Sequence, residues 1–180
     1  MEPVEINLGV YYLRALRADD RVDDRRAVLE GFADPDTRQW VPGYRIDTLS
    51  DAGAYIVRRA REWIRDERCS WAVADPFTGE LLGEVGLKDL DLTAGTAEAA
   101  CWTHPAGRGR GAASRALAAA LRFGFGALGL ERVLYKHFES NKASARVAEK
   151  CGFAPTGVIE QALLGDGTEE GLVVRAATSA

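Results

Sequence analysis

Two long stretches of the chain repeat apolar residues at the three- and four-residue spacing that buries one face of a helix. They cover residues 50–68 and 112–128, and alanines at the apolar positions of the second allow close packing on a sheet. Shorter helices are predicted over residues 22–32, which Asp34-Pro35 ends, and over residues 141–150. The polar and apolar pattern therefore predicts four helices.

Runs of strand-forming residues lie between and around these helices. They cover residues 9–16, 70–75, 81–87, 96–103, 132–138, 153–164 and 168–176. Short turns join the second, third and fourth runs, so we expect an antiparallel meander followed by a crossover helix. Gly165-Asp-Gly167 predicts a hairpin between the last two runs. Because neither a repeat nor a linker interrupts this order, we expect residues 1–180 to form a single α/β domain.

A glycine-rich segment joins the strand predicted over residues 96–103 to the helix predicted over residues 112–128. It is His104-Pro-Ala-Gly-Arg-Gly-Arg-Gly-Ala-Ala-Ser114. Glycines let the backbone approach a ligand closely, and the free N–H groups at a helix start attract anions. Arg108 and Arg110 add positive charge where a pyrophosphate would lie. The segment favours a phosphate-bearing ligand, although a plain strand-to-helix connection would have a similar sequence.

Three classes of ligand are bound by loops of this kind. A P-loop needs Lys and then Ser or Thr after its last glycine, whereas Ala112 and Ala113 follow Gly111. A dinucleotide loop tolerates a small residue where Ser114 stands, but it follows a strand buried on both faces. Residues 96–103 are half polar, which leaves a dinucleotide as the less favoured ligand. The third class is coenzyme A, because Arg108-x-x-Gly111-x-Ala113 resembles the acyl-CoA signature of the GCN5-related N-acetyltransferase (GNAT) superfamily.

The resemblance to the GNAT superfamily covers nearly the whole chain. The order of predicted elements is that of the GNAT fold, which has a mixed, mostly antiparallel sheet flanked by helices. Within the superfamily the chain looks most like the RimJ/RimL branch. The positions that carry this likeness are Asp34-Pro35, Trp40-Val-Pro-Gly43, Glu98, Trp102, Pro105, Leu128-Gly-Leu-Glu-Arg-Val133 and Asn141-x-x-Ser144-x-x-Val147-Ala-Glu-Lys-Cys-Gly-Phe153.

This resemblance implies that acetyl-CoA is the acyl donor and that a neutral primary amine attacks it directly. The backbone of Trp102 and Thr103 would pair with the pantetheine arm, and Asn141 would bond that arm near the thioester. The N–H groups that would hold the pyrophosphate belong to Arg108, Gly109, Arg110, Gly111, Ala112 and Ala113. No metal ion is implied.

Ser144 is the candidate donor to the leaving thiolate, because relatives of RimL carry a hydroxyl near the sulfur at the matching position. A helix-surface serine is the alternative interpretation. Many GNAT enzymes place a tyrosine one turn later, where this chain has Ala148. That departure favours Ser144, or a water molecule, as the donor.

The general base is harder to assign from the sequence. RimL-like enzymes carry a glutamate at the place that Leu163 occupies here. Glu98 and Glu84 lie on predicted central strands, and Glu160 is a third option. We rank Glu98 first, because a carboxylate on a strand of small apolar residues can be buried, which would raise its pKa.

The acyl acceptor is left open between a protein N-terminus and a small-molecule amine. Trp40 and Tyr44 are candidates for a wall of the acceptor pocket, or for local packing. The absence of the usual tyrosine and glutamate motivates a second hypothesis, a non-catalytic acyl-CoA-binding protein. His104 and His137 are expected to have structural roles. The chain is expected to be a monomer or a homodimer.

Charge and composition argue against several other classes of protein. The net charge of −4 argues against a nucleic-acid-binding protein, which is usually basic. Cys69, Cys101 and Cys151 are widely spaced, which does not suggest a zinc site. No signal peptide and no apolar run near eighteen residues is evident, so we expect a cytoplasmic protein that does not enter the membrane.

Overall fold

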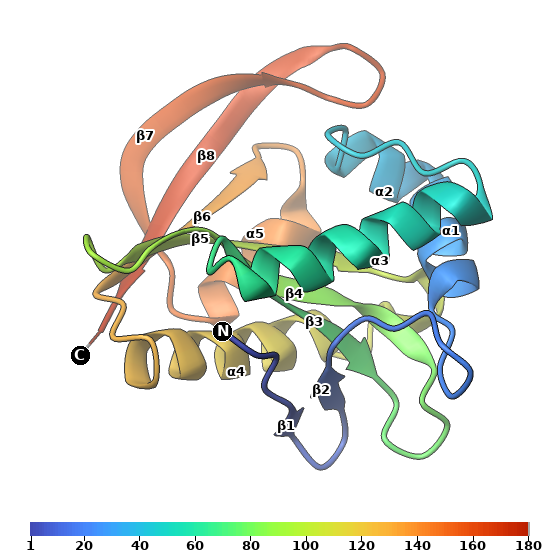
Figure 1. Cartoon of the computed structure of the whole chain (residues 1–180). Helices are drawn as coiled ribbons and strands as arrows, with labels where there is room; N and C mark the ends of the chain where they lie inside the picture. The colour runs from blue at the N-terminus through green and yellow to red at the C-terminus, as the bar shows by residue number, and fades with distance from the viewer. Residues whose placement is uncertain (180) are drawn as a thin grey trace.

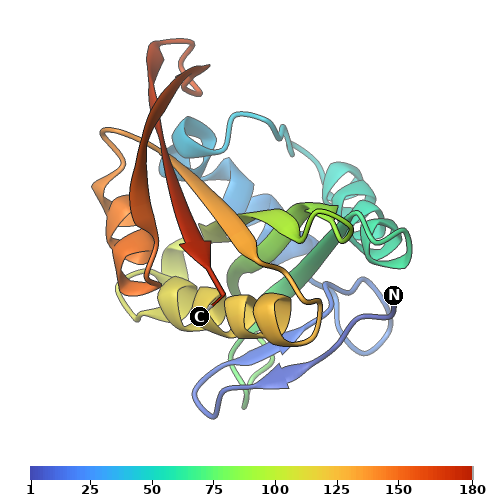
Figure 2. The same ribbon diagram turned by 90° about the vertical axis from the view of Figure 1, so that its left-hand side faces the viewer.

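The computed structural model describes residues 1–179 and arranges them around an eight-stranded sheet (Figures 1 and 2). The strands lie in the order β1-β2-β3-β4-β5-β6-β8-β7, and of the pairings described only that of β5 with β6 is parallel. Their bounds are β1 Ile6–Asn7, β2 Tyr12–Arg14, β3 Arg68–Ala74, β4 Leu81–Asp91, β5 Thr96–Thr103, β6 Arg132–Phe138, β7 Ala154–Leu163 and β8 Glu169–Thr178. The predicted meander is β3, β4 and β5, and the parallel pair has the predicted crossover helix between its strands.

Helices cover both faces of this sheet. α4 (Ala112–Gly126) and α5 (Lys142–Lys150) pack on one face, against apolar residues that alternate along β4, β5 and β6. α1 (Arg25–Ala33) and α3 (Leu49–Ile64) pack on the other face. Figure 1 shows α3 and α4 on opposite sides of the central strands. None of the helices described over residues 1–179 is long and apolar enough to cross a membrane.

Small side chains allow α4 to lie close to the sheet, as its alanine-rich pattern predicted. Ala116 and Ala120 are fully buried on its inner face. Gly124 continues that face, and a Cβ atom there would come within 2.8 Å of Leu87 Cδ1. The packing fixes the position of the N-terminus of α4, which lies next to the glycine-rich segment.

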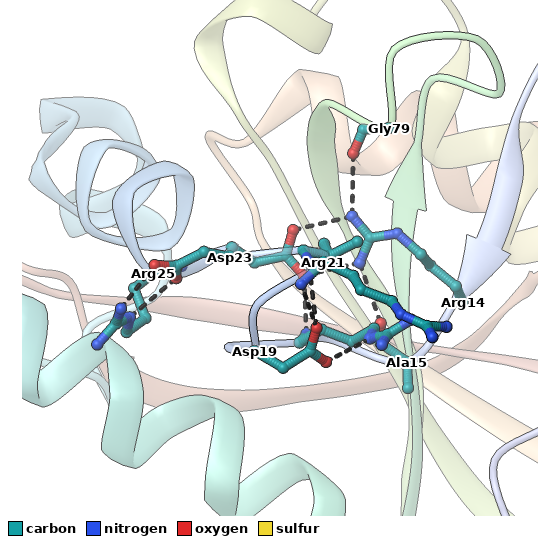
Figure 3. A network of polar contacts seen from close by, with 10 residues as sticks. Arg14, Ala15, Asp19, Arg21, Asp23, Arg25 and Gly79 are labelled. Carbon is teal, nitrogen blue, oxygen red and sulfur yellow. Dashed lines mark hydrogen bonds and ion pairs between the residues drawn. The ribbon is translucent and has the colours of Figure 1, made fainter.

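The N-terminal region differs from its predicted form. The strand expected over residues 9–16 is split into β1 and β2, because residues 8–11 form a turn in which Leu8 N donates to Tyr11 O. The helix expected from residue 22 begins at Arg25, because Asp24 is held by a buried ion pair with Arg14 at 2.7 Å. Figure 3 shows the Arg14 guanidinium also reaching the carbonyl oxygen of Gly79, which ties β2 to the β3–β4 turn.

A short helix, α2 (Pro35–Trp40), lies in a stretch for which the sequence pattern predicted neither a helix nor a strand. Asp34 and Pro35 end α1 as predicted, but they also start α2. The Asp34 carboxylate accepts a hydrogen bond from Thr37 N at 3.0 Å, and proline is well suited to the first helical turn. α3 also ends earlier than expected, at Ile64, because Arg68 already belongs to β3.

Candidate active site

The parallel strands β5 and β6 separate partway along their length. They pair from Thr96 with Arg132 to Ala99 with Tyr135, whereas β5 continues to Thr103 and β6 to Phe138. Beyond the last pair a cavity of about 510 Å³ opens between the strands. Its walls include residues 98–103 of β5 and 135–138 of β6. The gap therefore leaves one backbone edge of β5 available to pair with a bound extended group.

The glycine-rich segment forms one end of this cavity. Gly107 packs on the backbone of Leu82, where a Cβ would come within 2.5 Å of the carbonyl oxygen. Gly109 and Gly111 have φ of 73° and 75°, a region that side chains disfavour. Gly111 is the N-cap of α4, so the N–H groups of the first helical turn lack intrahelical partners. Free N–H groups at a helix N-terminus can bind an anion, so the segment has the geometry that such a site needs.

Arg108 and Arg110 do not supply the free positive charge that the sequence suggested. The Arg108 guanidinium pairs with Asp34 and, at 3.1 Å, with Asp36. These contacts tie the glycine-rich segment to α2. Although burial opposes ionisation of Asp34, its bonds with Arg108 and Thr37 lower the pKa of its carboxyl. Arg110 does not line the cavity, and its carbonyl oxygen accepts a hydrogen bond from Tyr11 Oη at 2.7 Å.

Two cations that the sequence analysis missed line the cavity from α5. Arg146 and Lys150 are four residues apart and therefore lie on one side of the helix. Within residues 1–179 neither side chain is described in a salt bridge. The four-residue spacing of two cations after the Asn141 motif was the available signal. They provide positive charge beside the N-terminus of α4.

Asn141 and Ser144 lie at the start of α5 and line the cavity. Asn141 Oδ1 accepts a hydrogen bond from Ser144 N at 3.0 Å and caps the helix, which leaves its amide nitrogen able to donate to a ligand. Ser144 Oγ lies 2.8 Å from the phenolic oxygen of Tyr135 on β6. Sequence reasoning overlooked Tyr135 because an aromatic residue in a strand normally indicates core packing.

Glu98 lines the cavity, but its surroundings are not the apolar ones expected. Its carboxylate lies 2.8 Å from Lys88 Nζ and 3.6 Å from Lys136 Nζ. Lys136 Nζ is also 2.9 Å from the carboxylate of Glu160, whose bond raises the pKa of the lysine. These contacts make Glu98 part of a chain of alternating charges that crosses β4, β5, β6 and β7.

Glu84 does not line the cavity, and its surroundings contradict the expected role as general base. The side chain is 1% exposed and lies 3.1 Å from Arg59 Nε and 3.2 Å from Arg68 Nη2. It also accepts hydrogen bonds from Tyr55 Oη and Trp102 Nε1. Burial opposes its ionisation, but the two guanidinium groups outweigh burial and lower its pKa. Glu84 is therefore a buried structural anion.

The remaining predicted residues separate into two groups. Trp40 lines the cavity and packs near Phe138, with ring centroids 6.2 Å apart. Tyr44 is outside the cavity lining and packs against Phe32 and Tyr55. Trp102 also lines the cavity, and its indole packs against Phe32 of α1.

The two histidines have hydrogen-bonded roles in the fold. His104 Nδ1 accepts a hydrogen bond from Ala106 N and caps a 3₁₀ turn over Pro105–Gly107. His137 lines the cavity, and its Nε2 accepts from Arg175 Nε at 3.0 Å while Nδ1 lies 2.9 Å from Phe138 O. The imidazole thus accepts at one nitrogen and donates at the other, which indicates a neutral ring.

Comparisons with known proteins agree with this arrangement. A family model described as an acetyltransferase (GNAT) domain matches residues 12–154. An uncharacterized N-acetyltransferase YoaA of Bacillus subtilis is 27% identical over 145 residues, which is 81% of this chain and 82% of that protein.

Solved structures share the fold at lower sequence identity. The ribosomal-protein-S5-alanine acetyltransferase of Vibrio fischeri has a TM-score of 0.83 and 15% identity, covering 97% of this chain and 96% of that one. A spermidine N-acetyltransferase of Vibrio cholerae, in complex with CoA and spermine, has a TM-score of 0.79 and 18% identity, with coverage of 94% and 95%. The match over residues 12–154 shows that the chain belongs to the GNAT family of acetyl-CoA-dependent N-acetyltransferases.

Proposed function

We propose that this enzyme transfers the acetyl group of acetyl-CoA to the primary amine of a small molecule or of a protein N-terminus, in the cavity between β5 and β6. The observation that carries the proposal is the separation of these strands after Ala99 and Tyr135. The open edge of β5, the glycine-rich start of α4 and the Ser144 hydroxyl all border this one space, which supports the proposal.

The chain offers groups for each part of acetyl-CoA, which supplies the reactive thioester. The N–H groups of residues 108–113 hold the pyrophosphate, with Arg146 and Lys150 adding positive charge. The backbone of Trp102 and Thr103 pairs with the pantetheine arm, and the Asn141 amide nitrogen donates to it.

Ser144 donates a hydrogen bond to the sulfur as negative charge develops there. The donor acts in the transition state, because the sulfur of a thioester is a weak acceptor and that of a thiolate is a strong one. Ala148, where many family members carry a tyrosine, is fully buried and contributes no polar atom.

Glu98 is the best-placed candidate to bind the acceptor's ammonium and to receive its proton, directly or through water. Of the two acidic side chains in the cavity lining, that of Asp36 is 71% exposed and pairs with Arg108, whereas that of Glu98 is 17% exposed and lies on the wall formed by β5. Its carboxylate also lies 2.8 Å from Lys88 Nζ and 3.6 Å from Lys136 Nζ.

The walls of the cavity where the acceptor would bind are partly apolar. Trp40, Val41, Phe138 and Leu172 contribute to its lining. The tip of the β7–β8 hairpin docks on the end of α2, where Gly165 N donates to Gln39 O at 3.0 Å. This contact joins the hairpin to α2, whose Asp36 and Trp40 line the cavity.

A panel of amines tests the proposal. Small amines, polyamines and short peptides with free N-termini would be incubated with the enzyme and acetyl-CoA. Thiol release and mass spectrometry of the amine would report transfer. We expect amine-dependent thiol release with an acetylated product. Tight acetyl-CoA binding with release only at the hydrolysis rate across the panel would instead favour a non-catalytic acyl-CoA-binding protein.

A further inference from the structure

A chain of three polar side chains crosses the point where β5 and β6 separate. Tyr135 Oη lies 2.8 Å from Ser144 Oγ on α5 and 3.4 Å from Cys101 Sγ on β5. All three residues line the cavity. Within residues 1–179, Tyr135 is the sole hydrogen-bond partner described for the Ser144 hydroxyl and for the Cys101 thiol.

Tyr135 is held in place firmly enough to orient its neighbour. The residue is 2% exposed, and its ring packs on Phe153 with centroids 5.2 Å apart. Its backbone is the last on β6 to pair with β5. Burial raises the pKa of both the Tyr135 phenol and the Cys101 thiol, so both groups keep their protons.

The hydrogens of Cys101, Tyr135 and Ser144 can be counted. These three donor groups share two contacts, so one hydrogen is left to bond a group outside the trio. If Cys101 donates to Tyr135 and Tyr135 donates to Ser144, the free hydrogen is that of Ser144. A phenol is a stronger donor than an aliphatic hydroxyl, which favours this direction, and each bond polarises the next.

We propose that Tyr135 is a positioning residue for acetyl transfer, donating to Ser144 Oγ so that the Ser144 hydrogen points at the sulfur of bound CoA. The proposal rests on the proposed function, because it needs CoA in the cavity. Cys101 supports the same direction from the far end of the chain.

The reaction balances without a proton passing through Tyr135. The N–C bond forms, the C–S bond breaks, and its electron pair stays on the sulfur. The ammonium has already given one proton to Glu98 or to water, the attacking neutral amine then loses a second proton to solvent, and the thiolate gains one from solvent. Cys101, Tyr135 and Ser144 contribute hydrogen bonds to the anion and end the reaction in their original protonation states.

The thiol of bound CoA provides a test that does not require an acceptor. A thiolate absorbs ultraviolet light more strongly than a thiol, so a pH titration of the complex reports the ionisation of bound CoA. The enzyme would be compared with Ser144→Ala, Tyr135→Phe and the double variant. Tyr135→Phe keeps the ring that packs on Phe153, and Cys101→Ala gives a second way to break the chain should Tyr135→Phe fold poorly.

We expect CoA bound to the unmodified enzyme to ionise at lower pH than free CoA. Losing one hydrogen bond should lower its acid dissociation constant about two- to tenfold in Tyr135→Phe, and less in Cys101→Ala. The double variant should match Ser144→Ala, because Tyr135 acts through Ser144. With an accepted amine, the kcat of the double variant should likewise equal that of Ser144→Ala. The KM for acetyl-CoA should stay nearly constant in all variants.

Two results would overturn the proposal. One is bound CoA that ionises no more easily than free CoA, and the other is independent, multiplying effects of Tyr135→Phe and Ser144→Ala. Tyr55→Phe is the control, since it removes a buried tyrosine hydroxyl outside the cavity lining and should leave the titration unchanged. Failure of CoA to bind at all would instead contradict the proposed function, and the role of Tyr135 with it.

Discussion

Ser144 combines a position on the cavity wall with a hydroxyl that reaches Tyr135. Ser144→Ala should lower kcat roughly ten- to a thousandfold, the scale for losing one positioned donor. The KM for acetyl-CoA should change little, because the lost interaction is made mainly in the transition state. Steady-state kinetics with an accepted amine, in conditions where chemistry limits turnover, measure both quantities. Unchanged kcat would mean that water or another residue donates the hydrogen bond to the sulfur.

Glu98→Gln should reduce kcat about a hundredfold or more if the carboxylate receives the proton of the acceptor. Glu160→Gln is a matched control, because Glu160 also pairs with Lys136 but is exposed and outside the cavity lining. We expect that control to stay near the activity of the unmodified enzyme. Equal losses of kcat in both variants would mean that the ion pairs of Lys136 matter, and not a base at Glu98.

Single residues were the hardest level to predict from the sequence. Glu84 and Glu98 both lie on central strands, and the sequence did not reveal that Arg59 and Arg68 pair with Glu84 rather than with Glu98. The Arg108 side chain looked available, but Asp34 and Asp36 lie far from it along the chain and engage it in the fold. Such pairings depend on side chains from distant segments, which local patterns do not encode.

The glycine-rich segment and α4 form the element that we expect to hold acetyl-CoA. Gly111→Glu should abolish or strongly weaken acetyl-CoA binding, because a carboxylate would occupy and repel the pyrophosphate site. Gly129→Glu is the control, since both glycines have positive φ, at 75° and 67°, and neither Cβ would meet another atom within 4 Å. The two substitutions therefore carry a similar backbone cost of about 1–2 kcal/mol.

Thermal unfolding with and without acetyl-CoA measures this difference. The ligand should raise the Tm of the unmodified enzyme and of Gly129→Glu, because it binds the native state, and should leave that of Gly111→Glu nearly unchanged. NAD and ATP should give much smaller shifts. Retained acetyl-CoA binding by a folded Gly111→Glu variant would exclude this segment from the site.

Elements with long periodic patterns were predicted well, whereas short ones were not. α4 and the β3–β4–β5 meander match the predicted order because periodicity, turns and capping agree. α2 was missed because its six residues are too few to show a period, and because Asp34-Pro35 was interpreted only as a stop signal. The first strand was interrupted by a turn that the run of strand-forming residues concealed.

At the scale of the whole molecule, the buried charges around Glu84 join α3 to the central sheet. Arg59 and Tyr55 belong to α3, Arg68 to β3 and Glu84 to β4. Glu84→Gln removes the fully buried anion that Arg59 and Arg68 share, leaves them only the less buried Glu62, and should lower the free energy of unfolding by about 3–5 kcal/mol. Urea unfolding near neutral pH measures this, and Glu160→Gln should cost about 1 kcal/mol or less.

The lowered pKa of Glu84 gives this stabilisation a pH dependence. Its folded-state pKa lies below the ordinary value of 4.5, so the contribution is complete above that value. As the pH falls through the folded-state pKa, Glu84 becomes protonated and the contribution is lost. The stability difference between the unmodified enzyme and Glu84→Gln should therefore shrink in acid. A constant difference down to the lowest pH at which the enzyme folds would show that charge is not its cause.

A crystal structure with CoA bound tests the central proposal most directly. We predict the pyrophosphate on the N–H groups of residues 108–113, the pantetheine arm along the free edge of β5, and the sulfur within hydrogen-bonding distance of Ser144 Oγ. A pantetheine arm outside the space between β5 and β6, or a sulfur far from Ser144, would contradict it.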